Sequence, residues 1–165
     1  TADENILNST RSTDFLTPKS AASQALRDAV LELARDQAFA RPFVNSGRLS
    51  TAVHYPSSPL STPDADAWAN GVAPGSPVLD APHADGWLLD ALGDEFVLLA
   101  RGWKGPAPAG ARLMELDGLA AERLGLTEGA AALVRPDQYV AARWKSAEPA
   151  AVNAALARAK GGRNG

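Results

Sequence analysis

The spacing of apolar residues predicts an amphipathic helix near the start of the chain. Its regularly spaced apolar positions are Ala22, Leu26, Val30 and Leu33. They recur every three or four residues between polar positions, which is the period of one helix face. The pair Thr17-Pro18 is typical of an N-cap followed by proline at the first helical position. We therefore predict a helix over residues 18–36 with one stripe that packs against another element.

The segment before this helix is more polar, because only Ile6 and Leu7 interrupt a series of Asn, Ser and Thr residues. We predict a helix over 3–14 that depends on tertiary contacts for its stability. Without a packing partner, these two helices would expose four apolar side chains, namely Ile6, Leu26, Val30 and Leu33. We therefore expect the helices to dock onto the rest of the chain or to self-associate.

Prolines break the helical pattern after Phe43. Four of them lie between residues 55 and 75, at positions 56, 59, 63 and 74. Because proline fixes φ and lacks an N–H donor, this segment can form neither a helix nor the centre of a sheet. We interpret residues 49–76 as a Pro/Ser-rich connector between a helical segment, 1–48, and a C-terminal domain, 77–165.

From residue 78 on, short apolar runs alternate with turn residues. The predicted elements are a short helix or turn at 87–92, strands at 95–100 and 112–116, a helix at 119–124, strands at 131–135 and 139–144, and a final helix. Pro136-Asp137 between the last two strands is typical of a hairpin turn. The final helix begins at Pro149 and is expected to bury Val152, Ala155, Leu156 and Ala159. This order predicts an α/β sandwich preceded by a mainly helical segment.

Composition narrows the possible functions. The chain has 165 residues, 45% of them apolar, and a formal net charge of -3. Its length suits one compact domain with an additional segment. The negative charge argues against a nucleic-acid partner, since phosphate binding needs clustered Lys and Arg. Apolar runs are far shorter than the roughly 18 residues of a membrane span. We expect a soluble, cytoplasmic protein without a membrane partner.

No common active-site motif is present in the sequence. The absence of cysteine excludes disulfides, thiolate catalysis and thiolate-bound zinc. His54 and His83 lack metal-ligand spacing, and we interpret them as surface or hinge residues. Three serines lie outside any Gly-x-Ser-x-Gly elbow, namely Ser9, Ser12 and Ser46. Three acidic residues are attributed to helix termination and solvation, namely Asp90, Asp94 and Glu95. We therefore predict no catalytic, cofactor-binding or metal-binding residue in this chain.

Four tryptophans and a basic group are the remaining candidates for function. Trp87 and Trp144 flank core runs and are expected to be buried. Trp68 and Trp103 lie in predicted loops. Each could pack within the chain or contact another module or a second subunit, and both alternatives stay open. Three basic residues surround the hairpin, namely Arg135, Arg143 and Lys145. They could form a small basic strip, and a solvated strand face is the preferred interpretation.

The predicted element order resembles the layout of the thioredoxin fold. In addition, several sequence blocks resemble the C-terminal region of class A FAD-dependent aromatic hydroxylases, the group that includes phenol hydroxylase. In the second half these blocks are 75–77, 81–83, 87–93, 96–99 and 133–143. Two N-terminal blocks, 4–8 and 14–20, resemble the helices that follow the last cofactor-binding motif of the flavin domain in these proteins, so residues 1–48 would be the end of a flavin-binding module. The hairpin block Leu-Val-Arg-Pro-Asp-Gln is the most specific of them.

This resemblance implies that the chain is a fragment of a larger monooxygenase. In the family, FAD reduced by NAD(P)H reacts with O2 to hydroxylate a phenolic ring, and the flavin-binding motifs lie upstream of this region. None of them occurs here, so no cofactor is expected in this fragment. A thioredoxin-like redox site would need cysteines near residues 83–89, where none stands. The implied role is structural, with the upstream flavin-binding domain and a homodimer as expected partners.

An alternative of a different class stays open. The chain could be a free-standing thioredoxin-like module that binds a protein partner and has no enzyme activity. The start at Thr1, without Met, favours a piece cut from a longer protein, although a processed start would also explain it.

Overall fold

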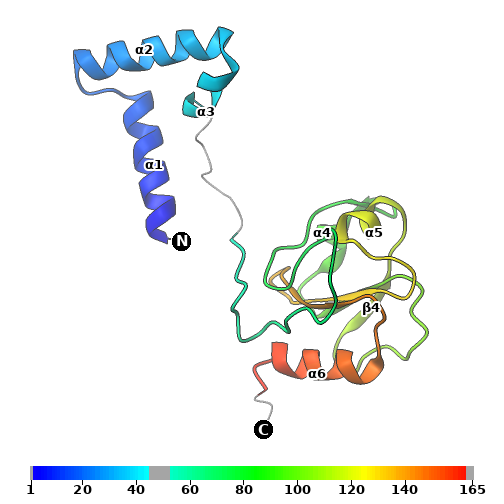
Figure 1. Ribbon diagram of the computed structural model, residues 1–165. Helices are drawn as coiled ribbons and strands as arrows, with labels where there is room; N and C mark the ends of the chain where they lie inside the picture. The colour runs from blue at the N-terminus through cyan, green and yellow to red at the C-terminus, as the bar shows by residue number, and fades with distance from the viewer. Residues whose placement is uncertain (1, 45–52, 163–165) are drawn as a thin grey trace. The chain divides into compact units, whose positions relative to one another are not determined.

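The computed structural model describes residues 2–44 and 53–162, and its fold is mixed α/β. The chain divides into two compact units, Thr1–Ala52 and Val53–Gly165 (Figure 1). The predicted connector begins in residues that the structure does not describe, and from Val53 on it belongs to the second unit.

The first unit is helical. It contains α1 (Ala2–Leu16), α2 (Ala21–Asp36), the short 3-10 helix η1 (Ala38–Ala40) and α3 (Arg41–Val44). Both predicted helices are therefore confirmed. Of the side chains described in this unit, Ala40 alone is buried, and α2 contributes no buried residue. Packing within this unit therefore stabilises its helices only weakly.

The predicted start of the second helix was wrong by three residues. Thr17 does not cap α2 but lies at the C-terminal end of α1, where its backbone N–H and its hydroxyl both donate to the carbonyl of Thr13. The N-cap of α2 is Ser20, whose Oγ accepts a hydrogen bond of 3.1 Å from the N–H of Ser23. Pro18 consequently lies in the link between the helices.

The second unit is built on a four-stranded mixed sheet. Its strands are β3 (Val97–Ala100), β4 (Arg112–Glu115), β5 (Ala131–Val134) and β6 (Val140–Trp144), in the spatial order β4-β3-β5-β6. β3 and β4 are parallel, whereas β3 with β5 and β5 with β6 are antiparallel. A two-stranded arm, β1 (Pro82–His83) and β2 (Gly86–Trp87), precedes α4 (Leu88–Leu92). The remaining helices are α5 (Gly118–Leu124) and α6 (Pro149–Ala159). The predicted order of helices and strands is confirmed.

Helices cover both faces of this sheet, as Figure 1 shows. Alternate residues of β3 point to opposite faces. Val97 and Leu99 join the apolar cluster that includes residues of α4 and α5, whereas Leu98 joins the cluster that contains α6. The α6 residues in that cluster are the four predicted ones, Val152, Ala155, Leu156 and Ala159. The sandwich architecture is thereby confirmed.

The Pro-rich segment packs along β6, which lies at the end of the sheet. Two of its backbone N–H groups donate to carbonyl oxygens of the strand. Thr62 N donates to Ala141 O at 2.7 Å, and Gly75 N donates to Val140 O at 2.8 Å. Val140 N in turn donates to Ser76 O at 2.9 Å. These contacts satisfy backbone groups of an edge strand, which would otherwise be open to pairing with another chain.

Gly75 is needed where this segment turns. Its φ is +84°, and a Cβ there would lie 2.2 Å from the carbonyl oxygen of Tyr55. The N–H of Tyr55 also donates to Gly75 O at 2.8 Å. Only glycine combines this backbone conformation with so close an approach.

Replacing Leu133 tests the central position of β5 in the core. Leu133 is fully buried, so Leu133→Ala should lower the free energy of unfolding by about 2–5 kcal/mol. Urea unfolding of residues 1–165 gives the measurement. Leu119→Ala is the control, since Leu119 is 45% exposed, and its change should stay within about 1 kcal/mol. Equal losses in the two variants would contradict this description of the core.

Candidate functional site

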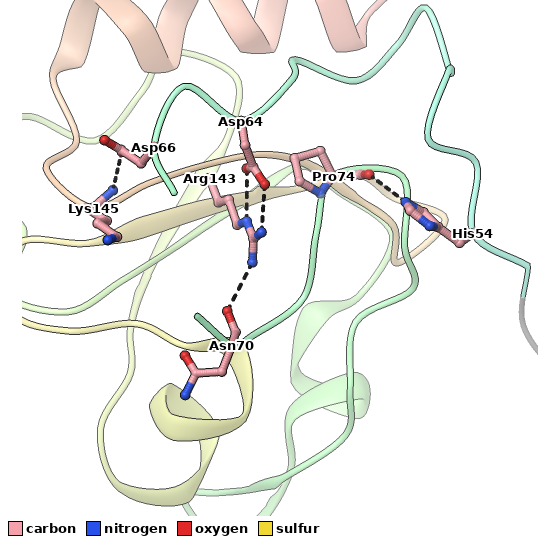
Figure 2. Close-up of polar contacts among 7 residues, drawn as sticks. All are labelled: His54, Asp64, Asp66, Asn70, Pro74, Arg143 and Lys145. Carbon is pink, nitrogen blue, oxygen red and sulfur yellow. Dashed lines mark hydrogen bonds and ion pairs between the residues drawn. The ribbon is translucent and has the colours of Figure 1, made fainter. Parts of the chain in front are cut away.

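A cluster of polar contacts in the second unit surrounds Arg143 on β6 (Figure 2). Arg143 is 8% exposed. Its guanidinium donates from Nε to Asp64 Oδ1 at 2.9 Å and from Nη2 to Asp64 Oδ2 at 2.6 Å. Its Nη1 reaches the carbonyl oxygen of Asn70 at 3.4 Å. The guanidinium and the carboxylate therefore form a bidentate ion pair.

An aromatic ring completes the surroundings of this cation. The Cζ of Arg143 lies 4.3 Å from the centre of the Trp68 ring, within the range of a cation–π contact. Trp68 is half-buried and packs against the apolar core. Arg143 thus holds the segment around residues 64–70 on the sheet, and each of its three side-chain nitrogens donates to a partner within the chain. The cluster can stabilise the fold, but it offers no free cation to a substrate.

The structure corrects the interpretation of the three basic residues as a solvated strand face. Arg143 is buried, whereas Arg135 pairs with Asp137 inside the hairpin turn. At Lys145 it is the backbone N–H that reaches Asp66, at 3.2 Å (Figure 2). These residues therefore do not form one basic strip. Sequence spacing could not identify Asp64 as the partner of Arg143, because the two positions lie 79 residues apart.

The two histidines lie in separate places. His54 is exposed, and its Nε2 lies 3.2 Å from the carbonyl oxygen of Pro74 (Figure 2). His83 is half-buried in β1. Within residues 2–44 and 53–162, no group of three His, Cys, Asp or Glu side chains could hold a metal ion. Ser9 and Ser12 lie in α1, and Ser46 lies outside the described residues.

The acidic residues near α4 form structural contacts or face solvent. Arg112 Nε donates to Glu95 Oε1 at 2.5 Å. The Nη2 of Arg112 donates to the carbonyl oxygens of Ala91, at 2.7 Å, and Leu92, at 3.0 Å. This cation therefore satisfies carbonyl groups at the C-terminal end of α4, where cations are favoured. Asp90 and Asp94 are exposed.

Neither of the two tryptophans that we expected to be buried is fully buried. Trp144 is half-buried against the cluster that contains α6. Trp87, which we expected to be buried, is 52% exposed, because it lies in the two-stranded arm rather than in α4. Of the two loop residues, Trp103 packs against the same cluster as Trp144 and donates from Nε1 to Pro106 O at 3.2 Å.

A cleft of about 430 Å³ lies beside Trp103. Its lining consists of Gly102, Trp103, Lys104, Gly105, Glu128, Gly129, Ser146, Ala147, Glu148 and Pro149. The pyrophosphate of a dinucleotide needs cations or a glycine-rich turn at a helix N-terminus. The lining carries two carboxylates, Glu128 and Glu148, and one cation, Lys104, so its net negative charge does not favour a pyrophosphate.

The first unit presents its apolar side chains to solvent. The large exposed ones are Ile6, Leu7, Leu16, Leu26, Leu31, Leu33 and Phe39. Three of the four residues expected to be exposed without a partner are among them, and Val30 is half-buried. None of the described helices is long and apolar enough to cross a membrane.

Solved structures of larger proteins share this fold. The rebeccamycin biosynthetic enzyme RebC with reduced flavin aligns with 98% of this chain and 33% of its own, with TM-score 0.59 and 22% identity. The flavin-dependent monooxygenase PieE in complex with FAD and substrate aligns with 92% of this chain and 32% of its own, with TM-score 0.56 and 18% identity. This chain therefore spans about a third of the length of these structures. At such identities the similarity shows the fold. No protein-family model and no curated protein matches the sequence.

Removing Asp64 tests the role of this ion pair, in which the Arg143 side chain is buried and the Asp64 side chain is 26% exposed. Asp64→Ala leaves the charge of Arg143 buried without its partner, so the free energy of unfolding should fall by about 3 kcal/mol. Urea unfolding measures the loss, and amide exchange at residues 62–76 should accelerate at the same time. Asp66→Ala is the matched control, since Asp66 accepts one bond from a backbone N–H, whereas Asp64 accepts two from the guanidinium of Arg143. A loss as large in the control would contradict the importance of the pair.

Proposed function

We propose that this chain is the C-terminal part of a FAD-dependent aromatic-ring monooxygenase that uses NAD(P)H. The observation that carries the proposal is the similarity to flavin enzymes over 98% or 92% of this chain but only a third of theirs. The hairpin block 133–138 and the N-terminal blocks, which resemble FAD-dependent aromatic hydroxylases, support the same assignment. In the complete protein, FAD supplies the oxidation chemistry and is bound by an upstream domain.

The role we assign to the residues of this chain is structural. Residues 1–48 form the end of the flavin-binding module, 49–76 the connector and 77–165 a supporting domain. Two arginines form hydrogen bonds between different segments of the second unit. Arg143 binds the Pro-rich segment, and Arg112 binds carbonyl oxygens at the C-terminal end of α4. The contacts described for His54, Glu95 and Arg135 are likewise internal. A domain whose charged side chains bind one another and the backbone in this way can serve as a scaffold without a catalytic residue of its own.

The supporting domain is proposed to be a redox-inactive member of the thioredoxin-like fold. Two parallel strands beside an antiparallel hairpin, followed by a helix, support this assignment. In this layout the redox site follows the first of the parallel strands. On this proposal, the counterpart of that site is the crossover 101–111 between β3 and β4, in place of residues 83–89, which we expected from the sequence. The crossover carries Trp103 and Lys104 but, like the whole chain, no cysteine.

A free-standing interaction module is the competing proposal. The second unit has two apolar clusters, one on each face of its sheet, and thus a core of its own. This observation favours a module that stands alone. Both proposals assume a cytoplasmic protein, in keeping with the absence of cysteine.

Expression of the complete reading frame that encodes this chain distinguishes the two proposals. If the chain belongs to a monooxygenase, the purified product carries FAD and oxidises NAD(P)H faster when a phenol is added. Flavin absorbance and NAD(P)H consumption give the measurements, and residues 1–165 alone, which should bind no FAD, are the control. A complete product that binds no flavin would contradict the monooxygenase and favour the free-standing module.

The structural role of the second unit makes a further prediction for the complete protein. Asp64→Ala should lower its melting temperature by several degrees but leave kcat per bound flavin unchanged. Thermal melting and steady-state turnover test this. A large fall in kcat per bound flavin, with little change in stability, would mean that the second unit contributes to catalysis directly.

A further inference from the structure

The crossover between β3 and β4 has a glycine with positive φ near each end. The φ of Gly102 is +70° and that of Gly110 is +85°, and glycine adopts this conformation without the strain that a Cβ atom would bring. Within the part of the chain that the structure describes, no backbone N–H from residue 104 to residue 110 donates a hydrogen bond. The middle of the crossover can therefore move about its two ends with little loss of backbone hydrogen bonding.

The ring of Trp103 connects this crossover to the rest of the domain. It packs against the apolar cluster that contains α6. Two further contacts lie within the crossover itself. The ring nitrogen Nε1 donates to Pro106 O at 3.2 Å, and a Cβ at Gly105 would lie only 2.6 Å from the ring atom Cζ2. Because residues 105 and 106 hold the ring, it moves together with the crossover.

Two cavities lie beside the crossover, and Trp103 and Pro149 belong to the lining of both. One is the cleft of about 430 Å³ described above. The other has about 320 Å³ and is lined by residues 106–109 of the crossover and by Asn153 of α6. The crossover is therefore not tightly packed on α6. Since the Trp103 ring is part of both walls, its departure would join the two cavities into one groove beside the first turns of α6.

The carboxylate of Glu115 on β4 holds the first end of the crossover. Its Oε2 accepts from Gly102 N at 2.9 Å, and its Oε1 accepts from Trp103 N at 3.0 Å. These hydrogen bonds are charge-assisted, but Glu115 is exposed, so water competes with both of them. The present position of the crossover thus depends on one surface carboxylate and on the apolar contacts of one ring.

We propose that residues 102–110 form a lid that opens as one body about Gly102 and Gly110. The structure shows the closed state, in which Glu115 binds the first hinge and the Trp103 ring lies against the α6 cluster. Opening withdraws the ring from this cluster and joins the two cavities, while the sheet stays intact. This inference goes beyond the proposed function, because it involves the second unit alone. Loss of FAD binding in the complete protein would not affect it.

Hydrogen exchange of the Trp103 indole N–H, followed by NMR on residues 1–165, tests whether the lid opens locally. Leu124 is 2% exposed and lies in the apolar cluster on the other face of the sheet. Leu124→Ala lowers the global stability, so it should speed exchange of the Leu133 amide by about thirtyfold or more. It should leave the exchange rate of the Trp103 indole unchanged, because local opening does not require unfolding of the sheet.

Removal of the Glu115 carboxylate tests what holds the lid closed. Glu115→Ala deletes two hydrogen bonds of the closed state and should speed exchange of the Trp103 indole N–H by about tenfold. Glu122→Ala is the matched control, since it removes another exposed carboxylate, on α5, and should leave the rate unchanged. Circular dichroism verifies that both variants fold. In the unchanged chain, relaxation dispersion should give the amides of the lid one common rate constant.

Three results would overturn the proposal. The first is a Trp103 indole N–H that accelerates as much as the Leu133 amide in Leu124→Ala, because the ring would then be released only by global unfolding. The second is the same exchange rate in Glu115→Ala and Glu122→Ala, which would mean that Glu115 does not hold the closed state. The third is the lack of a common rate constant in the lid, because its residues would then move independently of one another.

Discussion

The second unit depends on the burial of one cation, that of Arg143. A charged guanidinium under the protein surface is costly unless its donors are paired, and here Asp64, Asn70 and the ring of Trp68 surround it. These partners all come from the Pro-rich segment, which cannot form a helix or a regular strand. The ion pair therefore fixes a segment that has little secondary structure of its own, and this segment in turn covers β6 at the end of the sheet.

Most of the second unit could be predicted because its signals are local. Gly125 ends α5 in a left-handed conformation, and Pro149 lies in the first turn of α6. The buried face of α6 followed from the spacing of its apolar residues alone. Turn chemistry and periodicity act over a few residues, so they are readable in the sequence and are rarely overridden by distant contacts.

The predictions that failed involved competition or long-range contacts. Thr17-Pro18 is a good helix start by composition, but Ser20 provides a cap within reach of Ser23, and Thr17 bonds backwards instead. Trp87 stands beside core residues in the sequence, yet it lies in a two-stranded arm that leaves it exposed. The role of Arg143 could not be predicted either, because nothing in the spacing of charges indicates that this strand residue forms an ion pair with Asp64.

The small core of the first unit has a consequence for how residues 2–44 fold. With Ala40 as the buried apolar residue among its described side chains, this unit gains little free energy from internal packing, and helices of 15 and 16 residues are marginal by themselves. Their helix content then depends on the contacts that cover their apolar side chains, since a partner that binds only the folded state stabilises it. Any partner that covers the helices therefore acts as a folding ligand.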